Sequence, residues 1–389
     1  MTRLPVVSAL FSNVTRFLKL ESASGIVLGL AAIAATIVAN SAFNPVYQAA
    51  LSTKLGPLSV SGWINDGLMA LFFFVVGMEI KYELIDGALN SFARASLPVF
   101  GAIGGMIVPA LIFYSLNHSG PYAAGWGIPM ATDIAFAIGV ITVLGNRVPQ
   151  ALKIFLLALA IADDLGAIIV IALFYSSGVK LAYLGIAAGI LALIYFISRR
   201  DVRWVPLHVL LGLAVWFFVH EAGVHATIAG CALGFLMPHD DNNPADPTPL
   251  NRWVSRLHPV VGFAIMPIFA FANAGVVFSG IPWSEAFTHP LVIGIGLGLA
   301  VGKTIGIFGV SMLAVKLGFA KLPEMVNKRA LLGTAALGGI GFTMALFIAG
   351  LALKTNSAMN LAKVGIIGGS LLSAVIGVAL LMSSRGRSA

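Results

Sequence analysis

Two adjacent aspartates, Asp163 and Asp164, lie inside an apolar segment that extends over 151–174. Moving one such carboxylate to the centre of a membrane costs about 3 kcal/mol on insertion scales, and neighbouring carboxylates also repel each other. Acidic residues retained at this cost are typical of ion paths and proton relays rather than of structural cores. The pair therefore predicts a site at which a cation or a proton binds.

Two further charged residues extend this predicted site. Twelve of the fifteen acidic residues lie in predicted loops or at the ends of apolar segments, whereas Asp133, like Asp163 and Asp164, lies well inside one. Lys303 is the single basic residue in such a position. Because consecutive residues of an α-helix point about 100° apart, one aspartate of the pair can line an ion path while the other meets Lys303. The residues alone leave open which aspartate does which.

The composition places these charges in a membrane. The chain has 389 residues, of which 59% are hydrophobic and 10% charged, and its mean hydropathy is +0.98. Soluble domains have about 25% charged residues, so this composition predicts a polytopic membrane protein. The single cysteine, Cys231, excludes an intramolecular disulfide and a cysteine-cluster metal site. Basic residues before the first apolar segment indicate a retained signal-anchor helix.

Apolar segments of roughly 20 residues, the length of a helix that crosses a bilayer, predict twelve transmembrane helices in a single domain, 1–389. Their approximate limits are 22–41, 61–80, 95–116, 123–145, 150–175, 181–198, 204–219, 223–237, 258–279, 289–315, 328–352 and 357–382. Residues 47–61 lack a helical pattern and carry Gly-Pro at their centre. They predict a small external β-hairpin at about 45–60, with a plain loop as the alternative. The predicted fold class is an all-α membrane protein.

The basic residues predict the orientation, because cytoplasmic loops hold most lysines and arginines. The twelve spans place eighteen of the 23 basic residues on one side and four on the other, with Lys303 inside a span. The eighteen are Arg3, Arg16, Lys19, Lys81, Arg94, Arg147, Lys153, Arg199, Arg200, Arg203, Arg252, Arg256, Lys316, Lys321, Lys328, Arg329, Arg385 and Arg387, and the four are Lys54, Lys180, Lys354 and Lys363. Both termini are therefore predicted to be cytoplasmic. The net charge of +8 follows from this topology, and no nucleic-acid partner is expected.

Two predicted spans carry residues that interrupt helices. In the fourth span, Pro129 lacks a backbone donor, and Thr132 and Asp133 can bond backbone groups locally. The eleventh span contains the glycine-rich segment 337–343. Pairs of interrupted helices are typical of transporters that bind their substrate at mid-membrane.

The two interrupted helices occupy corresponding places in the chain. Spans 3–5 and 10–12 run in opposite directions, which predicts inverted-topology repeats over about 95–175 and 289–382. The interrupted helices would then cross at mid-membrane. Asp133 could offset the positive N-terminal ends, and Lys303 could offset the negative C-terminal ends or pair with an aspartate of span 5.

Six motifs are distributed over nearly the whole chain. They are Ala131-Thr-Asp-Ile-Ala-Phe-Ala137, Leu157-Ala-Leu-Ala-Ile-Ala-Asp-Asp-Leu-Gly-Ala-Ile168, Gly223-Val-His-Ala-Thr227, Phe269-Ala-Phe-Ala-Asn-Ala-Gly275, Gly302-Lys-Thr304 and Gly339-Ile-Gly-Phe-Thr-Met344. Together they resemble the NhaA family of bacterial sodium/proton antiporters. The aspartate pair followed by Leu-Gly-Ala, with Thr-Asp upstream, is the most specific part of the resemblance.

The resemblance implies a bacterial inner-membrane antiporter that exports sodium or lithium in exchange for protons, electrogenically and with activation at alkaline pH. It implies that Asp164 is the main ligand of the transported cation and that Asp163, Asp133, Thr132 and Lys303 complete the site. Asp163 and Asp164 would both contact the transported metal ion. It further implies a homodimer formed through the external hairpin. No cofactor is expected beyond the transported Na+, Li+ and H+.

The resemblance also implies a pH-responsive region at the cytoplasmic face, whose neighbourhood Glu79, Lys81, Glu83 and Asp86 match. A solvated loop face is the alternative for Glu79, Lys81 and Glu83. The chain departs from the usual pattern at Tyr82, where an arginine is usual, and at Val254, near the place of an acidic residue. The pH set point of the family therefore does not carry over to this sequence.

Structural roles are alternatives for several of these residues. His225, near the external end of span 8, is the histidine that suggests a pH response, but a satisfied structural histidine is the alternative. Asp133 could act only as a cap at a helix break, and Lys303 only as a counter-charge. The hydroxyl of Thr132 could bond its own helix, as membrane hydroxyls commonly do.

The expected mechanism is competition between a cation and protons for the same carboxylates. A hard cation needs several oxygen ligands, which carboxylates, hydroxyls and backbone carbonyls supply. Lys303 would stabilise an ionised partner, and rocking of the helix bundle would expose the site to each side in turn.

Proteins of other classes also use paired aspartates. Prenyltransferases need Asp-Asp-x-x-Asp, but the fifth position here is Ala167, and intramembrane aspartyl proteases need a Gly-x-Gly-Asp motif that is absent. Neither enzyme class fits, so the chain is not expected to be an enzyme. A sodium-coupled solute symporter remains the alternative, although spans 4, 5, 10 and 11 offer few polar groups for an organic solute.

Overall fold

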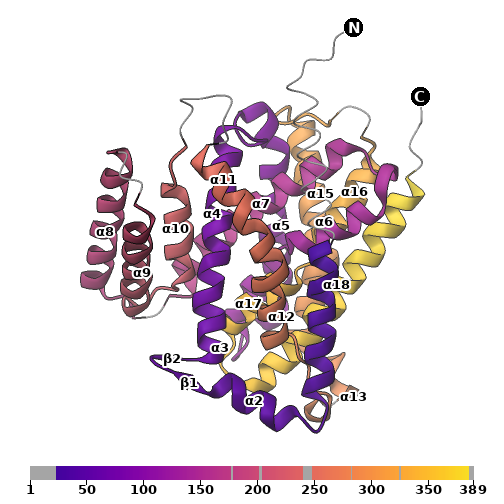
Figure 1. The fold of residues 1–389 in the computed structure, drawn as a ribbon. Coiled ribbons are helices and arrows are strands. Elements are labelled where there is room, and N and C mark those ends of the chain that lie inside the picture. Colours follow the sequence, from indigo (N-terminus) through magenta and orange to yellow (C-terminus); the bar gives the residue numbers. More distant parts are fainter. Residues whose placement is uncertain are drawn as a thin grey trace.

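The computed structural model describes residues 23–176, 178–200, 204–239, 248–281, 283–323 and 326–384. Within these residues the chain forms a bundle of helices with one two-stranded sheet (Figure 1). Some of the basic residues used to predict the orientation lie outside the described residues, namely Arg3, Arg16, Lys19, Arg203, Arg385 and Arg387.

Seven helical segments of the described chain are long and apolar enough to cross a membrane. They are α5 (Phe92–Asn117), η2 with α6 (Ala123–Met130 and Ile134–Val143), α7 (Gln150–Phe174), α8 (Leu181–Arg199), α11 with η4 and α12 (Pro249–Val260, Val261–Ile265 and Met266–Asn273), α14 with η6 and α15 (Pro290–Leu297, Gly298–Gly302 and Lys303–Lys316), and α18 (Asn356–Ser383). Two bent pairs raise the number to nine if each pair is one span, namely the helix Ala23–Ala39 with α2 (Asn44–Ser52), and α16 (Lys328–Leu337) with α17 (Phe342–Ala352). The prediction of a helical membrane protein is confirmed at this level.

The remaining predicted spans coincide with shorter helices. Residues 61–80 fall within the run formed by α3 (Val60–Gly62), η1 (Trp63–Leu68) and α4 (Met69–Ile85). Residues 204–219 and 223–237 correspond to α9 (Val205–Glu221) and α10 (Thr227–Leu236). Short connecting helices are η3 (Gly145–Arg147), η5 (Phe278–Gly280) and α13 (Trp283–Ala286).

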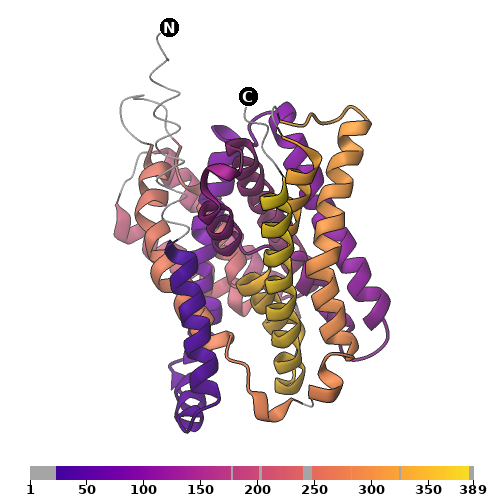
Figure 2. The same ribbon diagram turned by 90° about the vertical axis from the view of Figure 1, so that its right-hand side faces the viewer.

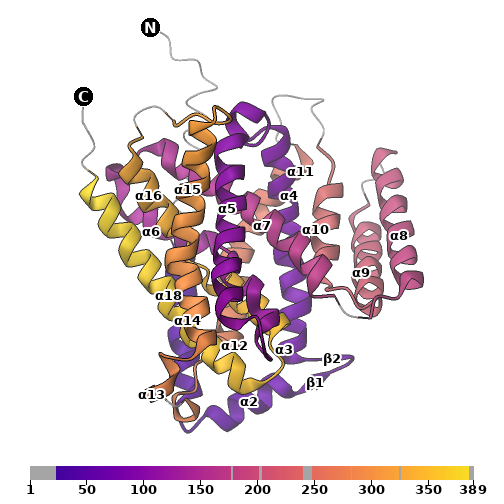
Figure 3. The same cartoon turned by 180° about the vertical axis from the view of Figure 1, so that it is seen from behind.

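Glycines allow two helix pairs to pack with their backbones in contact. A Cβ atom added to Gly104 of α5 would lie 2.1 Å from the Gly306 carbonyl oxygen of α15, which lies beside α5 (Figure 3). A Cβ added to Gly230 of α10 would lie 2.0 Å from the Ala70 carbonyl oxygen of α4. Small residues at such interfaces are typical of helix packing in membranes, where lipid gives no hydrophobic drive for association. These contacts fix α5 against α15 and α4 against α10.

Helices α8 and α9 stand at one side of the molecule, beside α10, and α16 and α18 stand at the other (Figure 1). A small apolar cluster joins α8, α9 and α10, and it is formed by Ala187, Ile194, Val215, Val219 and Ala229. Figure 2 shows that the helix Ala23–Ala39 runs toward the side that carries the hairpin, whereas α18 runs away from it.

The predicted hairpin is present but shorter than expected. Strands β1 (Lys54–Leu55) and β2 (Leu58–Ser59) pair antiparallel around a turn at which Gly56 has φ +67°. The prediction that strand structure starts at about residue 45 is wrong, because 44–52 form the helix α2. Pro45 lies in the first turn of α2, where its missing N–H costs nothing, and the buried Tyr47 hydroxyl donates to the Phe271 carbonyl at 2.6 Å. This tertiary bond holds α2 against the bundle.

Candidate functional site

The first predicted helix break lies between η2 and α6. Helix η2 ends at Met130, residues 131–133 are extended, and α6 begins at Ile134. Asp133 is the N-cap of α6, and its Oδ1 accepts a hydrogen bond from the Phe136 N–H at 3.1 Å. The chain therefore interrupts its helix where the sequence predicts, with the aspartate at the start of the second half.

The second predicted break lies between α16 and α17, whose axes differ by 47°. The two breaks bond directly to each other. The Asp133 N–H donates to the Ile340 carbonyl at 2.6 Å, and the Thr132 hydroxyl donates to the Gly338 carbonyl at 2.7 Å. The interrupted segments are thus held together by backbone groups that the breaks leave without helical partners.

Asp133 serves both breaks at once. Its Oδ2 accepts hydrogen bonds from the Thr343 N–H, at 3.0 Å, and from the Thr343 hydroxyl. Because its Oδ1 caps α6 and its Oδ2 bonds the first turn of α17, one buried carboxylate faces two helix N-termini. Negative charge is stabilised at such ends by the helix dipole and by unpaired N–H groups.

The Lys303 ammonium group lies at a helix C-terminus, whereas Asp133 faces helix N-termini. Its Nζ is 2.6 Å from Asp163 Oδ2, and both side chains are buried, with 0% and 1% of the side chain exposed. The same ammonium group donates to the carbonyl of Met130, the last residue of η2. Lys303 thus neutralises Asp163 and also satisfies a carbonyl at a helix C-terminus, where positive charge is favoured.

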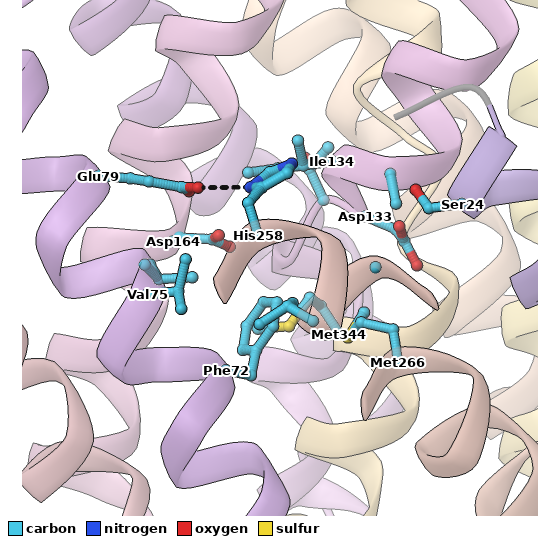
Figure 4. Close-up of a pocket in the computed structure, with 15 residues that line it drawn as sticks. Ser24, Phe72, Val75, Glu79, Asp133, Ile134, Asp164, His258, Met266 and Met344 are labelled. Carbon is cyan, nitrogen blue, oxygen red and sulfur yellow. Dashed lines mark hydrogen bonds and ion pairs between the residues drawn. The ribbon is translucent and has the colours of Figure 1, made fainter. Parts of the chain in front are cut away.

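Asp164 has different surroundings from Asp163. It is 1% exposed, and neither of its carboxylate oxygens has a hydrogen-bond partner in the described part of the chain. The side chain lines a cavity of about 50 Å³, which Figure 4 shows beside Asp133, Glu79 and His258. Thr132 also lines the cavity, whereas Asp163 and Lys303 do not.

This cavity is lined mainly by apolar side chains, with a few oxygen atoms among them. Its apolar lining includes Phe72, Val75, Met266 and Met344, which Figure 4 places below and around Asp164. A space of this size exceeds the roughly 15 Å³ that a cavity needs to hold one water. The arrangement can hold a small cation with carboxylate and hydroxyl oxygens near it, and it has little room for an organic solute.

The residues predicted for a pH response do not form one cluster. Glu79 lines the cavity, and its Oε1 lies 2.9 Å from His258 Nδ1. Lys81 instead donates to the Phe235 and Met237 carbonyls at the end of α10, at 2.9 and 2.6 Å. These bonds link α4 to α10 and leave the ammonium group away from the cavity lining.

Glu83 and His225 make hydrogen bonds that do not involve Glu79. Glu83 accepts a hydrogen bond from the Ala88 N–H at 2.6 Å, which closes the turn after α4. His225 lies between α9 and α10, and its Nε2 donates to the Tyr175 carbonyl at 3.0 Å. Burial raises the pKa of Tyr175 to about 12, and its hydroxyl donates to the Ala124 carbonyl at 2.7 Å. His225 therefore joins α10 to the ends of α7 and η2.

The site thus combines two helix breaks that are hydrogen-bonded to each other, one aspartate neutralised by a lysine and one aspartate in a cavity without a hydrogen-bond partner among the described residues. Comparison with known proteins identifies the family of the chain that carries this site. The family model described as Na+/H+ antiporter 1 matches residues 15–381, nearly the whole sequence. The chain belongs to this antiporter family.

Individual relatives within the antiporter family are similar along their full length. The protein named Na(+)/H(+) antiporter NhaA 2 of Pseudomonas syringae pv. syringae is 49% identical over 370 residues, covering 95% of this chain and 94% of the relative. The Na(+)/H(+) antiporter NhaA of Mesorhizobium japonicum is 48% identical, covering 94% and 93%. That of Vibrio cholerae serotype O1 is 47% identical, covering 95% and 97%. The resemblance to the NhaA family is therefore confirmed.

Two residues of this candidate site were missed in the sequence. Thr343 bonds Asp133 twice, and the threonine after the glycine-rich break was the available signal. His258 pairs with Glu79 at the cavity, and its place at the start of a predicted span was a weaker signal. Neither partner is close in sequence to the acid it meets, so only the folded chain reveals these contacts.

Proposed function

We propose that this protein exports sodium or lithium ions in exchange for protons. The observation that carries the proposal is Asp164, a buried carboxylate whose two oxygens have no partner among the described residues and which lines a cavity. Family membership agrees with it, because the relatives are named Na(+)/H(+) antiporters. No chemical reaction is assigned to the chain.

Asp164 is the proposed main ligand of the transported cation. Sodium and lithium are hard cations that take oxygen ligands, and Thr132 and Asp133 line the same cavity. The Thr132 hydroxyl donates to Gly338, so its oxygen lone pairs remain able to accept a cation. The described residues hold no cluster of three or more metal-binding His, Cys, Asp or Glu side chains.

Protons and the cation compete for Asp164 in this proposal. Either one neutralises the carboxylate, so release of one accompanies uptake of the other. Asp163 is held by Lys303 at 2.6 Å and cannot offer the same oxygen to a cation until that pair opens. If Asp163 or Lys303 also exchanges a proton when the pair opens, two protons are exchanged for one cation and the exchange is electrogenic, with Asp163 as a second ligand.

The topology proposed for this exchange has twelve spans, inverted repeats over about 95–175 and 289–382, and both termini in the cytoplasm. Support comes from the two breaks, which occupy corresponding places in the repeats and bond to each other. Glu79 and His258 line the cavity together with Asp164, which is consistent with access from the side where Lys81 and Glu83 lie. Alternating access, with activation at alkaline pH, would expose the same carboxylate to each side in turn.

The protein is proposed to act as a homodimer in the bacterial inner membrane. The β1–β2 hairpin projects from the bundle (Figure 1), and its strand β1 carries Leu55 with 56% of the residue exposed. Exposed strand edges can pair with another copy. Such pairing would leave the cavity in each protomer complete.

The decisive experiment uses the purified protein in proteoliposomes with an imposed pH gradient. Addition of sodium or lithium alone should collapse the gradient, and Asp164→Asn should abolish this effect. Asp66→Asn removes an acidic residue that does not line the cavity and should keep the exchange. Exchange that persists in Asp164→Asn would refute the assignment of the site, and a requirement for an organic solute would favour a symporter.

A further inference from the structure

Helix α18 carries two buried serines one turn apart, Ser370 and Ser373, on the face that meets the second break. Their exposed fractions are 6% and 0%. Ser370 Oγ accepts hydrogen bonds from the Gly341 N–H at 3.3 Å and the Phe342 N–H at 3.2 Å. Ser373 Oγ has no hydrogen-bond partner among the described residues, and a Cβ added to Gly339 would lie 2.5 Å from it. Only the first of the two hydroxyls bonds the break.

The bonds of Ser370 matter because α17 has no cap of its own. The residue at its N-cap is Gly341, which makes no side-chain cap bond. The first N–H groups of a helix need outside acceptors, and a buried donor left unpaired costs about 1–3 kcal/mol. Three consecutive N–H groups, those of residues 341–343, are therefore shared between Ser370 and Asp133.

Because Ser370 and Asp133 together accept the hydrogen bonds of the α17 N-terminus, α18 is connected to the cavity. Asp133 accepts the N–H of Thr343 and its hydroxyl through Oδ2 while also lining the cavity beside Asp164. If the Ser370 hydroxyl were absent, two more buried N–H groups would need an acceptor next to a carboxylate that already bonds this helix end. Asp133 would then be drawn further toward α17 and away from a cation.

We propose that Ser370 is a positioning residue for cation binding, because it holds the N-terminus of α17 and so sets the place of the Asp133 carboxylate in the cavity. Ser370 itself does not line the cavity. The proposal rests on the proposed sodium/proton exchange and assigns to α18 a part in setting cation affinity.

The test compares Ser370→Ala with Ser373→Ala, since both serines are buried and only one bonds the break. In proteoliposomes, Ser370→Ala should raise the KM for sodium about tenfold and leave the maximal rate within about twofold, because it weakens cation binding. Ser373→Ala should leave the KM unchanged. Ser370→Thr keeps a hydroxyl acceptor and should restore the KM toward that of the parent.

A second readout does not depend on transport. Sodium that binds the folded protein raises its thermal unfolding temperature in detergent, and the sodium concentration needed to produce a given rise should also increase about tenfold in Ser370→Ala. Equal KM values for Ser370→Ala and the parent, or equal shifts in both alanine variants, would overturn the proposal. Failure of the proposed exchange would instead appear as parent protein that binds sodium without collapsing the pH gradient.

Discussion

Lys303 and Asp163 form a buried ion pair, with Nζ 2.6 Å from Oδ2, while the next residue in the chain, Asp164, lies outside this pair and lines the cavity. The separation follows from helix geometry, because consecutive side chains of α7 point about 100° apart. The two aspartates share a helix turn, and each is only 1% exposed, but they differ in their electrostatic partners. Several expected outcomes follow from this difference and from the contacts around it.

Breaking the ion pair should destabilise the protein strongly. Lys303→Met leaves Asp163 as an unpaired buried charge, for which a loss of about 3–5 kcal/mol is expected. The double variant Lys303→Met with Asp163→Asn should recover much of this loss, because neither charge remains. Thermal unfolding in detergent measures both effects. Asp164→Asn is the matched control and should not lower the unfolding temperature, and an equal loss in all three variants would contradict the pairing.

Removal of the Asp133 side chain should weaken both helix breaks. Asp133→Ala leaves the N–H groups of Phe136 and Thr343, and the Thr343 hydroxyl, without their carboxylate acceptor. Each unsatisfied buried donor costs about 1–3 kcal/mol, so the loss should exceed that of Asp164→Ala, which removes no hydrogen bond. The comparison is made by thermal unfolding. Similar stability of the two alanine variants would show that Asp133 does not cap the breaks.

A methyl group at Gly306 should disrupt the packing of α5 against α15. The added Cβ would lie 2.1 Å from the Gly104 carbonyl oxygen, whereas at Gly309 in the same helix it would meet nothing within 4 Å. Gly306→Ala should therefore cost about 1–3 kcal/mol or more, and Gly309→Ala should be neutral. Yield of folded protein after size-exclusion chromatography, together with unfolding temperature, gives the measurement. A stable Gly306→Ala protein would refute the close approach.

His225 should make stability depend on pH. Burial lowers its pKa below the ordinary value of 6.5, although the hydrogen bond to the Tyr175 carbonyl opposes this shift. The folded protein thus favours the neutral ring, so the stability contributed by His225 is fully present above pH 6.5 and is lost as pH falls through the lowered pKa.

The check is the unfolding temperature of the parent and of His225→Gln at about pH 7.5 and about pH 5. Glutamine keeps a donor for Tyr175 but does not titrate, so the parent should lose more stability on acidification. Identical losses in the two proteins would show that His225 does not contribute to the pH dependence.

Much of this site could be predicted from the sequence because each of its charges is costly in an apolar segment. Asp133, Asp163 and Lys303 are visible as charges in predicted spans, and Pro129 and the glycines of 337–343 mark the two breaks. These are local signals, since one residue type in one segment carries each of them. Whether Lys303 pairs with Asp163 or with Asp164 depends on how α7 and α15 are rotated about their axes. The residues alone therefore left the partner of Lys303 open.

Other features escaped prediction because tertiary contacts decide them. Residues 44–52 become a helix, and the hydroxyl of Tyr47 is bonded to a carbonyl of α12 that is distant in sequence. Lys153, which the sequence places on the cytoplasmic side, is only 9% exposed and donates to the Gly145 carbonyl at 3.0 Å. Lys363 donates to the Gly275 carbonyl at 2.8 Å in a similar way. Single backbone acceptors of this kind leave no pattern in the sequence.

The unpartnered oxygens of Asp164 also bear on leakage. A buried ionised carboxylate that accepts no hydrogen bond from the described residues is the least stable form of the site, because burial removes most of its hydration. A carrier that must pass through this empty, charged form crosses a high energy barrier. In the proposed cycle the carrier therefore rarely returns empty, and the membrane keeps its proton gradient when no sodium is present to exchange.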